Sequence, residues 1–192
     1  MSDPKTTPQQ PALSKKAIFF RRLTSSLVLW TVVLTSLFSG MPTLSNTVFL
    51  LIILVLAVTG LSEFYGMVEQ RGLVCFKMSG LIGGFLLMLG TFLNLTGKLG
   101  TSGSPARVND FETSFLILFV LGLCLRQFFA KSSTTGILAI STTLFGLMYV
   151  PYLLNFIQKI NYFPHVEGQF YLLYFILITK FSDMGAYAVG SL

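Results

Sequence analysis

The sequence consists of apolar runs, each about as long as a membrane crossing, separated by short polar connections. A helix needs about 20 apolar residues to cross a hydrocarbon core of roughly 30 Å. In lipid, only helices and closed barrels satisfy their own backbone hydrogen bonds, and continuous apolar runs of this length indicate helices. We therefore expect an all-α, polytopic membrane protein with about six transmembrane helices, at about 23–39, 47–65, 74–95, 111–129, 135–156 and 169–190.

Composition supports this interpretation and excludes an ordinary soluble domain. Of the 192 residues, 53% are hydrophobic and only 10% are charged, whereas soluble domains carry about 25% charged residues. We expect a polar, disordered cytoplasmic tail at 1–16 and a single transmembrane domain at 17–192. The net charge of +6 is spread over short connections and forms no basic stripe, so no nucleic-acid binding is expected.

The distribution of Lys and Arg predicts the orientation, because cytoplasmic loops are enriched in these residues. With a cytoplasmic N-terminus, ten of the 13 lie on the cytoplasmic side, namely Lys5, Lys15, Lys16, Arg21, Arg22, Arg71, Lys77, Arg126, Lys131 and Lys180. The remaining three, Lys98, Arg107 and Lys159, lie on the opposite side. The sixth span then ends near the cytoplasmic face.

Two features inside the spans concern helix geometry. Gly80 and Gly84 have the small-xxx-small spacing that allows two helices to approach closely. Pro151 falls within the fifth expected span, where the missing backbone N–H is expected to kink or end the helix.

The sixth expected span contains a lysine and an aspartate, which membrane helices seldom carry. Lys180 and Asp183 follow the apolar run 170–179, and ionisable groups inside spans are costly and usually mark a functional site. On a helix, Lys180, Asp183 and Tyr187 share one face. Beside that face runs a seam of small residues expected to pack tightly, formed by Ser182, Ala186 and Gly190.

A carboxylate at the cytoplasmic membrane boundary is a suitable ligand for Mg²⁺, which prefers oxygen donors and often binds together with substrate phosphates. Lys180, one turn from Asp183, would neutralise a phosphate. Reactions that join a nucleotide to a phospholipid need such groups, because both reactants are negatively charged. The alternative is that Lys180 and Asp183 form an intrahelical ion pair with a purely structural role.

The segment from Lys180 to Gly190 resembles the start of the signature region of the phosphatidate cytidylyltransferases, also called CDP-diacylglycerol synthases. In that family a span ends in a pattern like (small)-Asp-x-Gly-Ala-Tyr-x-x-Gly, which Asp183, Gly185, Tyr187 and Gly190 match. The segment from Ser62 to Tyr65 also looks like the Glu-Phe-Tyr segment after an early span of the family.

The resemblance implies transfer of a cytidylyl group from CTP to phosphatidate in phospholipid biosynthesis, giving CDP-diacylglycerol and pyrophosphate, with Mg²⁺ as cofactor. It implies that Asp183 is the metal ligand, and we predict Asp183 and Lys180 as catalytic residues. The predicted substrate contacts are Lys180, Ser182, Gly185 and Tyr187. The expected partners are CTP, phosphatidate and membrane phospholipids, with a homodimer also allowed, in a multi-pass protein of the cell (inner) membrane.

The family pattern continues past this motif with a basic, glycine-containing loop and a Ser-Pro-Lys-Lys-Thr-like stretch, and neither follows Leu192. We therefore expect the chain to be C-terminally truncated and inactive by itself. Three alternatives stay open. The protein would be a CTP-dependent polyprenol or phytol kinase, a CDP-archaeol synthase, or a non-enzymatic membrane transporter or assembly protein.

Overall fold

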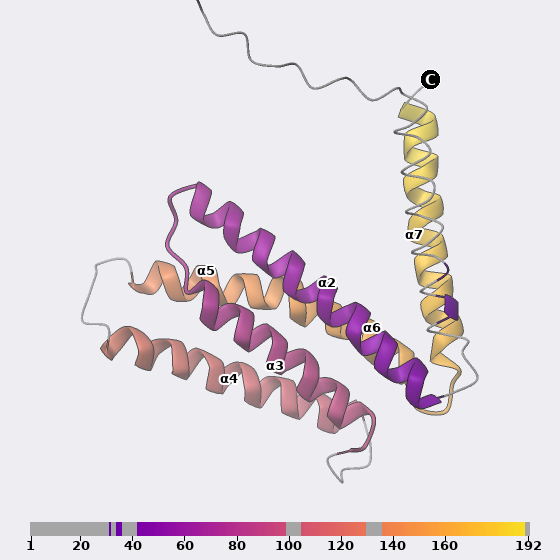
Figure 1. Ribbon diagram of the computed structural model, residues 1–192, viewed down its shortest axis with the longest axis horizontal. Coiled ribbons are helices and arrows are strands. Elements are labelled where there is room, and N and C mark those ends of the chain that lie inside the picture. The colour runs from indigo at the N-terminus through magenta and orange to yellow at the C-terminus, as the bar shows by residue number, and fades with distance from the viewer. Residues whose placement is uncertain (1–30, 32–33, 36–41, 99–104, 130–135, 191–192) are drawn as a thin grey trace, which may run out of the picture. The chain divides into compact units, whose positions relative to one another are not determined.

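The computed structural model describes residues 31, 34–35, 42–98, 105–129 and 136–190, in which all regular structure is helical (Figure 1). The elements are α2 (Pro42–Gln70), α3 (Lys77–Leu95), α4 (Pro105–Phe129), α5 (Gly136–Leu147), the π-helical turn η1 (Met148–Tyr152), α6 (Leu153–Asn161) and α7 (Gly168–Gly190). The expected all-α class is confirmed. The tail at 1–16 and most of the first expected span, 23–39, lie outside the described residues.

The chain divides into two compact units, Met1–Asn46 and Thr47–Leu192, and the second contains nearly all of the described helical residues. Four helical segments in the described residues are long and apolar enough to cross a membrane: Leu44–Gln70, Lys77–Leu95, Val108–Phe129 and Gly136–Asn161. They correspond to the second to fifth expected spans. The helix α7 has 23 residues and is not among these four, so the count of six spans stays a prediction.

Several helix boundaries differ from the expected ones. The helix α2 continues to Gln70, beyond the expected end at 65, and α4 begins at Pro105, inside the loop expected before 111. The fifth span was expected to end at 156, whereas α6 continues to Asn161. A continuous apolar run marks the stretch of a helix that lies in lipid, whereas the helical backbone continues into the polar boundary region on either side.

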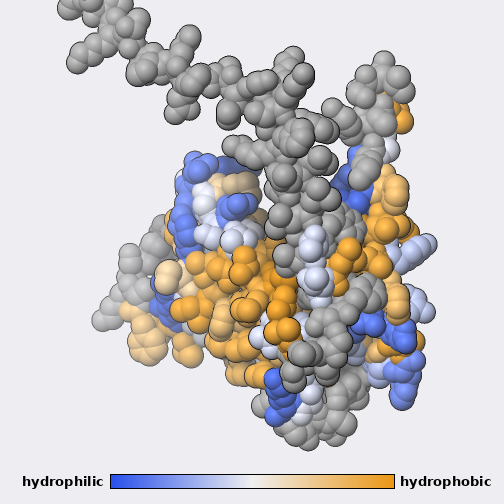
Figure 2. All heavy atoms as spheres, turned by 45° about the vertical axis from the view of Figure 1, so that its right-hand side comes forward, coloured by the Kyte–Doolittle hydropathy of each residue, from blue (hydrophilic) through white to orange (hydrophobic). Residues whose placement is uncertain are grey.

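The outward faces of these helices are apolar. Leu51 on α2, Leu118 on α4 and Ile137 on α5 are 56%, 67% and 83% exposed, and Figure 2 shows hydrophobic residues over a broad area of the described surface. Exposed apolar area of this extent is rare in soluble monomers and is what a lipid-facing surface requires. The structure and the composition thus agree on a membrane protein.

The helix α3 is the central helix of the second unit and contacts α4, α5, η1 and α6. Its buried Gly80 and Gly84 also let side chains of α2 and η1 approach its backbone closely. A Cβ atom on Gly80 would overlap the hydroxyl of Tyr65, and one on Gly84 would lie 2.9 Å from Leu61 and 3.0 Å from Pro151. The prediction that Gly80 and Gly84 permit close packing is confirmed.

Replacing Gly80 by Ala is expected to destabilise the protein by about 1–3 kcal/mol, the usual cost of overpacking. The reason is Tyr65, which is fully buried and donates a hydrogen bond to the carbonyl oxygen of Thr143 at 2.7 Å, so it has little freedom to move. Gly66→Ala is the matched control, because a Cβ there meets no atom within 4 Å. Thermal unfolding in detergent measures the stability of both variants, and equal melting temperatures for Gly80→Ala and Gly66→Ala would contradict the packing described.

Pro151 does not end its helix. It lies inside the π-helical turn η1, and the chain continues directly into α6. A π-helical turn shifts the hydrogen-bond pattern by one residue, which accommodates a backbone nitrogen that cannot donate. The single span Gly136–Asn161 therefore contains α5, η1 and α6.

Glycines close the ends of α2 and α3. Gly72 and Gly97 have positive φ angles of 73° and 68°, which glycine adopts without steric cost. After α2, the amide of Leu73 donates a hydrogen bond to the carbonyl oxygen of Val68 at 3.1 Å. After α3, the amide of Lys98 donates a hydrogen bond to the carbonyl oxygen of Leu93 at 3.2 Å. These are Schellman-type ends, which satisfy carbonyl groups at the membrane boundary.

Candidate functional site

The residues predicted from the sequence as a functional site all belong to α7. Lys180, Ser182, Asp183 and Gly185 are exposed on its C-terminal half. Tyr187 is part of the same helix, with a side chain outside the described part of the structure. The helix therefore presents a lysine and a carboxylate one turn apart to the surroundings.

Lys180 and Asp183 do not bond to each other. In the part of the chain that the structure describes, ion pairs join Lys77 to Glu69 at 3.3 Å and Lys159 to Glu112 at 2.5 Å. The interpretation of Lys180 and Asp183 as a structural ion pair therefore finds no support. The Asp183 carboxylate is open to a ligand.

The small-residue seam on α7 is not packed, contrary to expectation. Ser182, Ala186 and Gly190 are exposed, and a Cβ on Gly190 would meet no atom within 4 Å. The helix α7 contacts α6, and its buried residues Gly168 and Leu172 lie near its start. Small residues allow another helix to approach closely, but no helix of the described chain packs against this seam in the C-terminal half of α7.

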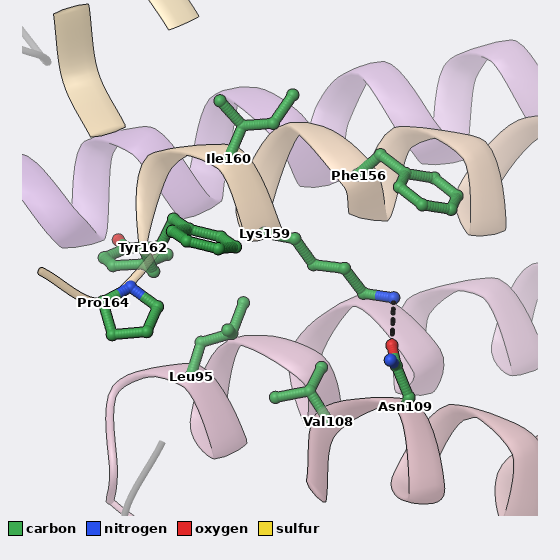
Figure 3. A pocket seen from close by; sticks show the side chains of 9 residues that line it. Leu95, Val108, Asn109, Phe156, Lys159, Ile160, Tyr162 and Pro164 are labelled. Carbon is green, nitrogen blue, oxygen red and sulfur yellow. Dashed lines mark hydrogen bonds between the residues drawn. The ribbon is translucent and has the colours of Figure 1, made fainter. Parts of the chain in front are cut away.

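A buried polar cluster connects α3, α4 and α6, and it was not predicted from the sequence. Its centre is Glu112 on α4, which is 2% exposed and pairs with the ammonium of Lys159 at 2.5 Å. Lys159 also donates to Asn109 Oδ1 at 3.0 Å (Figure 3). The amide nitrogen of the fully buried Asn155 donates to Thr91 Oγ1 at 2.9 Å and to Glu112 Oε1 at 3.3 Å.

Gln158 extends the cluster toward the backbone of α3. Its amide nitrogen donates to Asn155 Oδ1 at 3.1 Å and to the carbonyl oxygen of Met88 at 3.3 Å, while its own Oε1 has no hydrogen-bond partner in the structure. The sequence signal was the spacing of Asn155, Gln158 and Lys159, which recur three and four residues apart and so share one face of a helix. The cluster holds α3, α4 and α6 together and is structural, because its two charges, Glu112 and Lys159, pair with each other.

A cavity of about 310 Å³ lies next to this cluster, between the end of α3, the start of α4 and the turn after α6. Figure 3 shows Lys159 and Asn109 at one side of it, with Leu95, Val108 and Pro164 among the apolar lining residues. Burial raises the pKa of the lining Tyr162 to about 12. The charge of Lys159 is already neutralised by Glu112. The cavity therefore offers no free positive charge from this lysine to bind a nucleoside triphosphate.

The exposed carboxylate of Glu69, in the last turn of α2, pairs with Lys77 at the start of α3. Burial, with the nearby Glu69 charge as a second cause, raises the pKa of the Cys75 thiol. A thiol with a raised pKa is a weak nucleophile at neutral pH. Neither feature provides catalytic groups.

A comparison with protein families matches residues 21–192 to the cytidylyltransferase family. No curated protein and no solved structure matched the chain. The family match covers the four membrane-length helices found among the described residues, and α7 with its exposed aspartate. The chain therefore belongs to the cytidylyltransferase family, which makes it a membrane nucleotidyltransferase that uses CTP.

Proposed function

We propose that the protein transfers the cytidylyl group of CTP to phosphatidate, forming CDP-diacylglycerol and pyrophosphate at the cytoplasmic face of the cell membrane. The observation that carries this proposal is the combination of family membership with the motif from Asp183 to Gly190 on α7. The exposed Asp183 carboxylate is the group that such chemistry needs at the boundary between lipid and water.

In the proposed reaction, an oxygen of the phosphatidate phosphate forms a bond to the α-phosphorus of CTP. The bond from that phosphorus to the oxygen leading to the β-phosphate breaks, and pyrophosphate leaves with the electron pair. Both reactants are anionic, so the protein acts mainly by positioning them and by compensating charge. Placing the site at the end of α7 would let the lipid phosphate stay at headgroup level while CTP arrives from water.

The residues present fit a Mg²⁺ ion that is bound jointly with the nucleotide. Within the described residues, no group of three or more His, Cys, Asp and Glu side chains is placed to hold a metal alone. Mg²⁺ usually takes one or two protein carboxylates and completes its shell with water and substrate phosphates, and Asp183 would be one such carboxylate. When bound, the ion would offset charge on the phosphates.

Lys180 would hold a phosphate beside Asp183. The two residues are three positions apart on a helix, which is about 4.5 Å of axial rise at 1.5 Å per residue. We expect Lys180→Met to raise the KM for CTP about tenfold, because it removes one charge-assisted hydrogen bond. Lys180→Arg should recover most of the affinity. Initial rates over a CTP series measure this, and an unchanged KM in Lys180→Met would remove Lys180 from the site.

The lipid acceptor distinguishes the proposed function from its alternatives. Membranes containing the protein expressed from the complete reading frame that includes this sequence would be supplied with CTP and one acceptor lipid at a time. Phosphatidate is the expected acceptor, and its conversion should exceed that of an archaeal ether-lipid phosphate or of a polyprenol. A clear preference for either of the other two acceptors would replace phosphatidate in the proposal.

A further inference from the structure

A groove of about 410 Å³ runs between α3 and α4, and none of its lining residues belongs to α7. Its walls are apolar and outward-facing, since Ile82, Leu86 and Leu118 are 56%, 48% and 67% exposed. Gly83 and Gly122, which have no side chains, are among its lining residues. The groove therefore opens to the lipid surroundings of the helices.

One end of the groove carries a positive charge. Arg126, in the last turn of α4, lines the groove beside Ser79 and donates a hydrogen bond to the Ser79 hydroxyl. Its guanidinium carbon lies 4.3 Å from the centroid of the Phe76 ring, which fixes the planar group in place. Arg126 takes part in neither of the two ion pairs found among the described residues.

The Arg126 charge therefore has no carboxylate partner in the described chain, although it lies at the end of a membrane-length helix. A guanidinium carries five N–H donors, and Ser79 accepts from only one of its nitrogens. The remaining donors have the fork geometry that matches a phosphate. A positive group at the end of an apolar groove is complementary to a molecule with an anionic head and a hydrocarbon chain.

We propose that this groove is a binding site for an anionic glycerophospholipid, with the headgroup phosphate on Arg126 and one acyl chain along the groove. A second protein helix is a less suitable occupant, because an apolar helix would bury the Arg126 charge without compensation. The Lys and Arg distribution predicts that this end faces the cytoplasm. The cytoplasmic leaflet is rich in anionic lipids, which are attracted to cationic side chains near its surface.

Phosphatidylglycerol is the probe for the test, because it is anionic but is not the acceptor in the proposed reaction. The purified protein in detergent would be titrated with phosphatidylglycerol or with zwitterionic phosphatidylcholine, and bound lipid would be counted by native mass spectrometry. We expect tighter binding of phosphatidylglycerol, and a loss of about five- to tenfold in its affinity in Arg126→Met. Raising the salt concentration should weaken binding to the wild type more than to this variant.

Gly122→Leu tests the apolar part of the site independently. A Cβ at Gly122 meets no atom within 4 Å, so the larger side chain can extend into the groove without displacing protein atoms. It should weaken binding of both lipids while the melting temperature stays within a few degrees of wild type. Gly66→Leu is the matched control, because Gly66 has equally open surroundings but lies on α2, away from the groove lining.

Arg71→Met is the matched control for charge, since Arg71 is exposed on the connection between α2 and α3. It should leave the phosphatidylglycerol affinity within about twofold of wild type. The proposal is overturned if Arg126→Met and Gly122→Leu both bind phosphatidylglycerol like wild type. It is equally overturned if Arg71→Met loses as much affinity as Arg126→Met, because binding would then reflect overall surface charge.

Discussion

Replacing Asp183 by Asn should lower the rate of CDP-diacylglycerol formation by about a hundredfold or more, the range seen when one group that stabilises transition-state charge is removed. Asn keeps the size and the helical position of the side chain but removes the negative charge that would bind Mg²⁺. Because Asp183 is exposed and has no partner among the described residues, the change should leave stability and membrane insertion nearly unaltered.

The measurement is the initial rate in membranes that contain equal amounts of wild-type and variant protein from the complete reading frame. Asp110→Asn is the matched control, since Asp110 is also an exposed aspartate on a helix but lies on α4. It should keep activity close to wild type. Near-normal turnover of Asp183→Asn at saturating Mg²⁺ would show that Asp183 is not an essential metal ligand.

The second large effect concerns the Glu112 and Lys159 pair. Lys159→Met should lower the free energy of unfolding by about 3–5 kcal/mol, because it leaves the Glu112 charge buried without its counter-charge. Glu112 is 2% exposed and the Lys159 side chain 19%. The double variant Glu112→Leu with Lys159→Met should recover much of this loss, since a buried ion pair replaced by apolar groups is often nearly neutral.

Unfolding of the purified proteins by denaturant in mixed micelles measures these differences. Lys77→Met serves as control, because the Lys77 and Glu69 side chains are 35% and 49% exposed. Exposed pairs contribute about 1 kcal/mol or less. If Lys159→Met and Lys77→Met are destabilised equally, or if the double variant is worse than Lys159→Met alone, the pair does not hold the helices together as described.

The sequence predicted the parts of the fold that depend on local chemistry. Continuous apolar runs indicated the second to fifth spans, and the spacing of Gly80 and Gly84 predicted a close approach to their helix. The structure shows that Tyr65 and Leu61 make this approach. Both predictions depend on a single helix. The length of its apolar run decides whether it crosses the lipid, and small residues on one face decide how closely a neighbour can approach. The direct continuation through Pro151 was harder to foresee, because a proline in a span is compatible with a kink, a π-helical turn or an end.

The buried cluster was missed because it depends on pairing across the fold. Glu112 and Lys159 are 47 residues apart, and the sequence placed one at a span boundary and the other in a loop. Each position is also a normal place for a solvated charge. Their spacing on single helices shows which face they occupy, whereas only the packing of α4 against α3 and α6 brings them together.

The residues on α7, by contrast with the cluster, were singled out from the sequence. The motif from Asp183 to Gly190 indicated the family, and the family match over residues 21–192 confirmed that recognition. The roles of Lys180, Ser182, Asp183, Gly185 and Tyr187 stay predictions. A short motif identifies which side chains share a helix face, but binding of CTP or a metal depends on groups that converge on that face from elsewhere.

The fate of two labels in CTP tests the proposed reaction most directly. CTP carrying radioactive phosphorus at either the α or the γ position would be incubated with phosphatidate, Mg²⁺ and membranes that contain the protein from the complete reading frame. The α label should appear in the lipid product and the γ label in pyrophosphate. Transfer of the γ label to lipid would indicate a kinase, and a lipid fraction free of both labels would contradict cytidylyl transfer to phosphatidate.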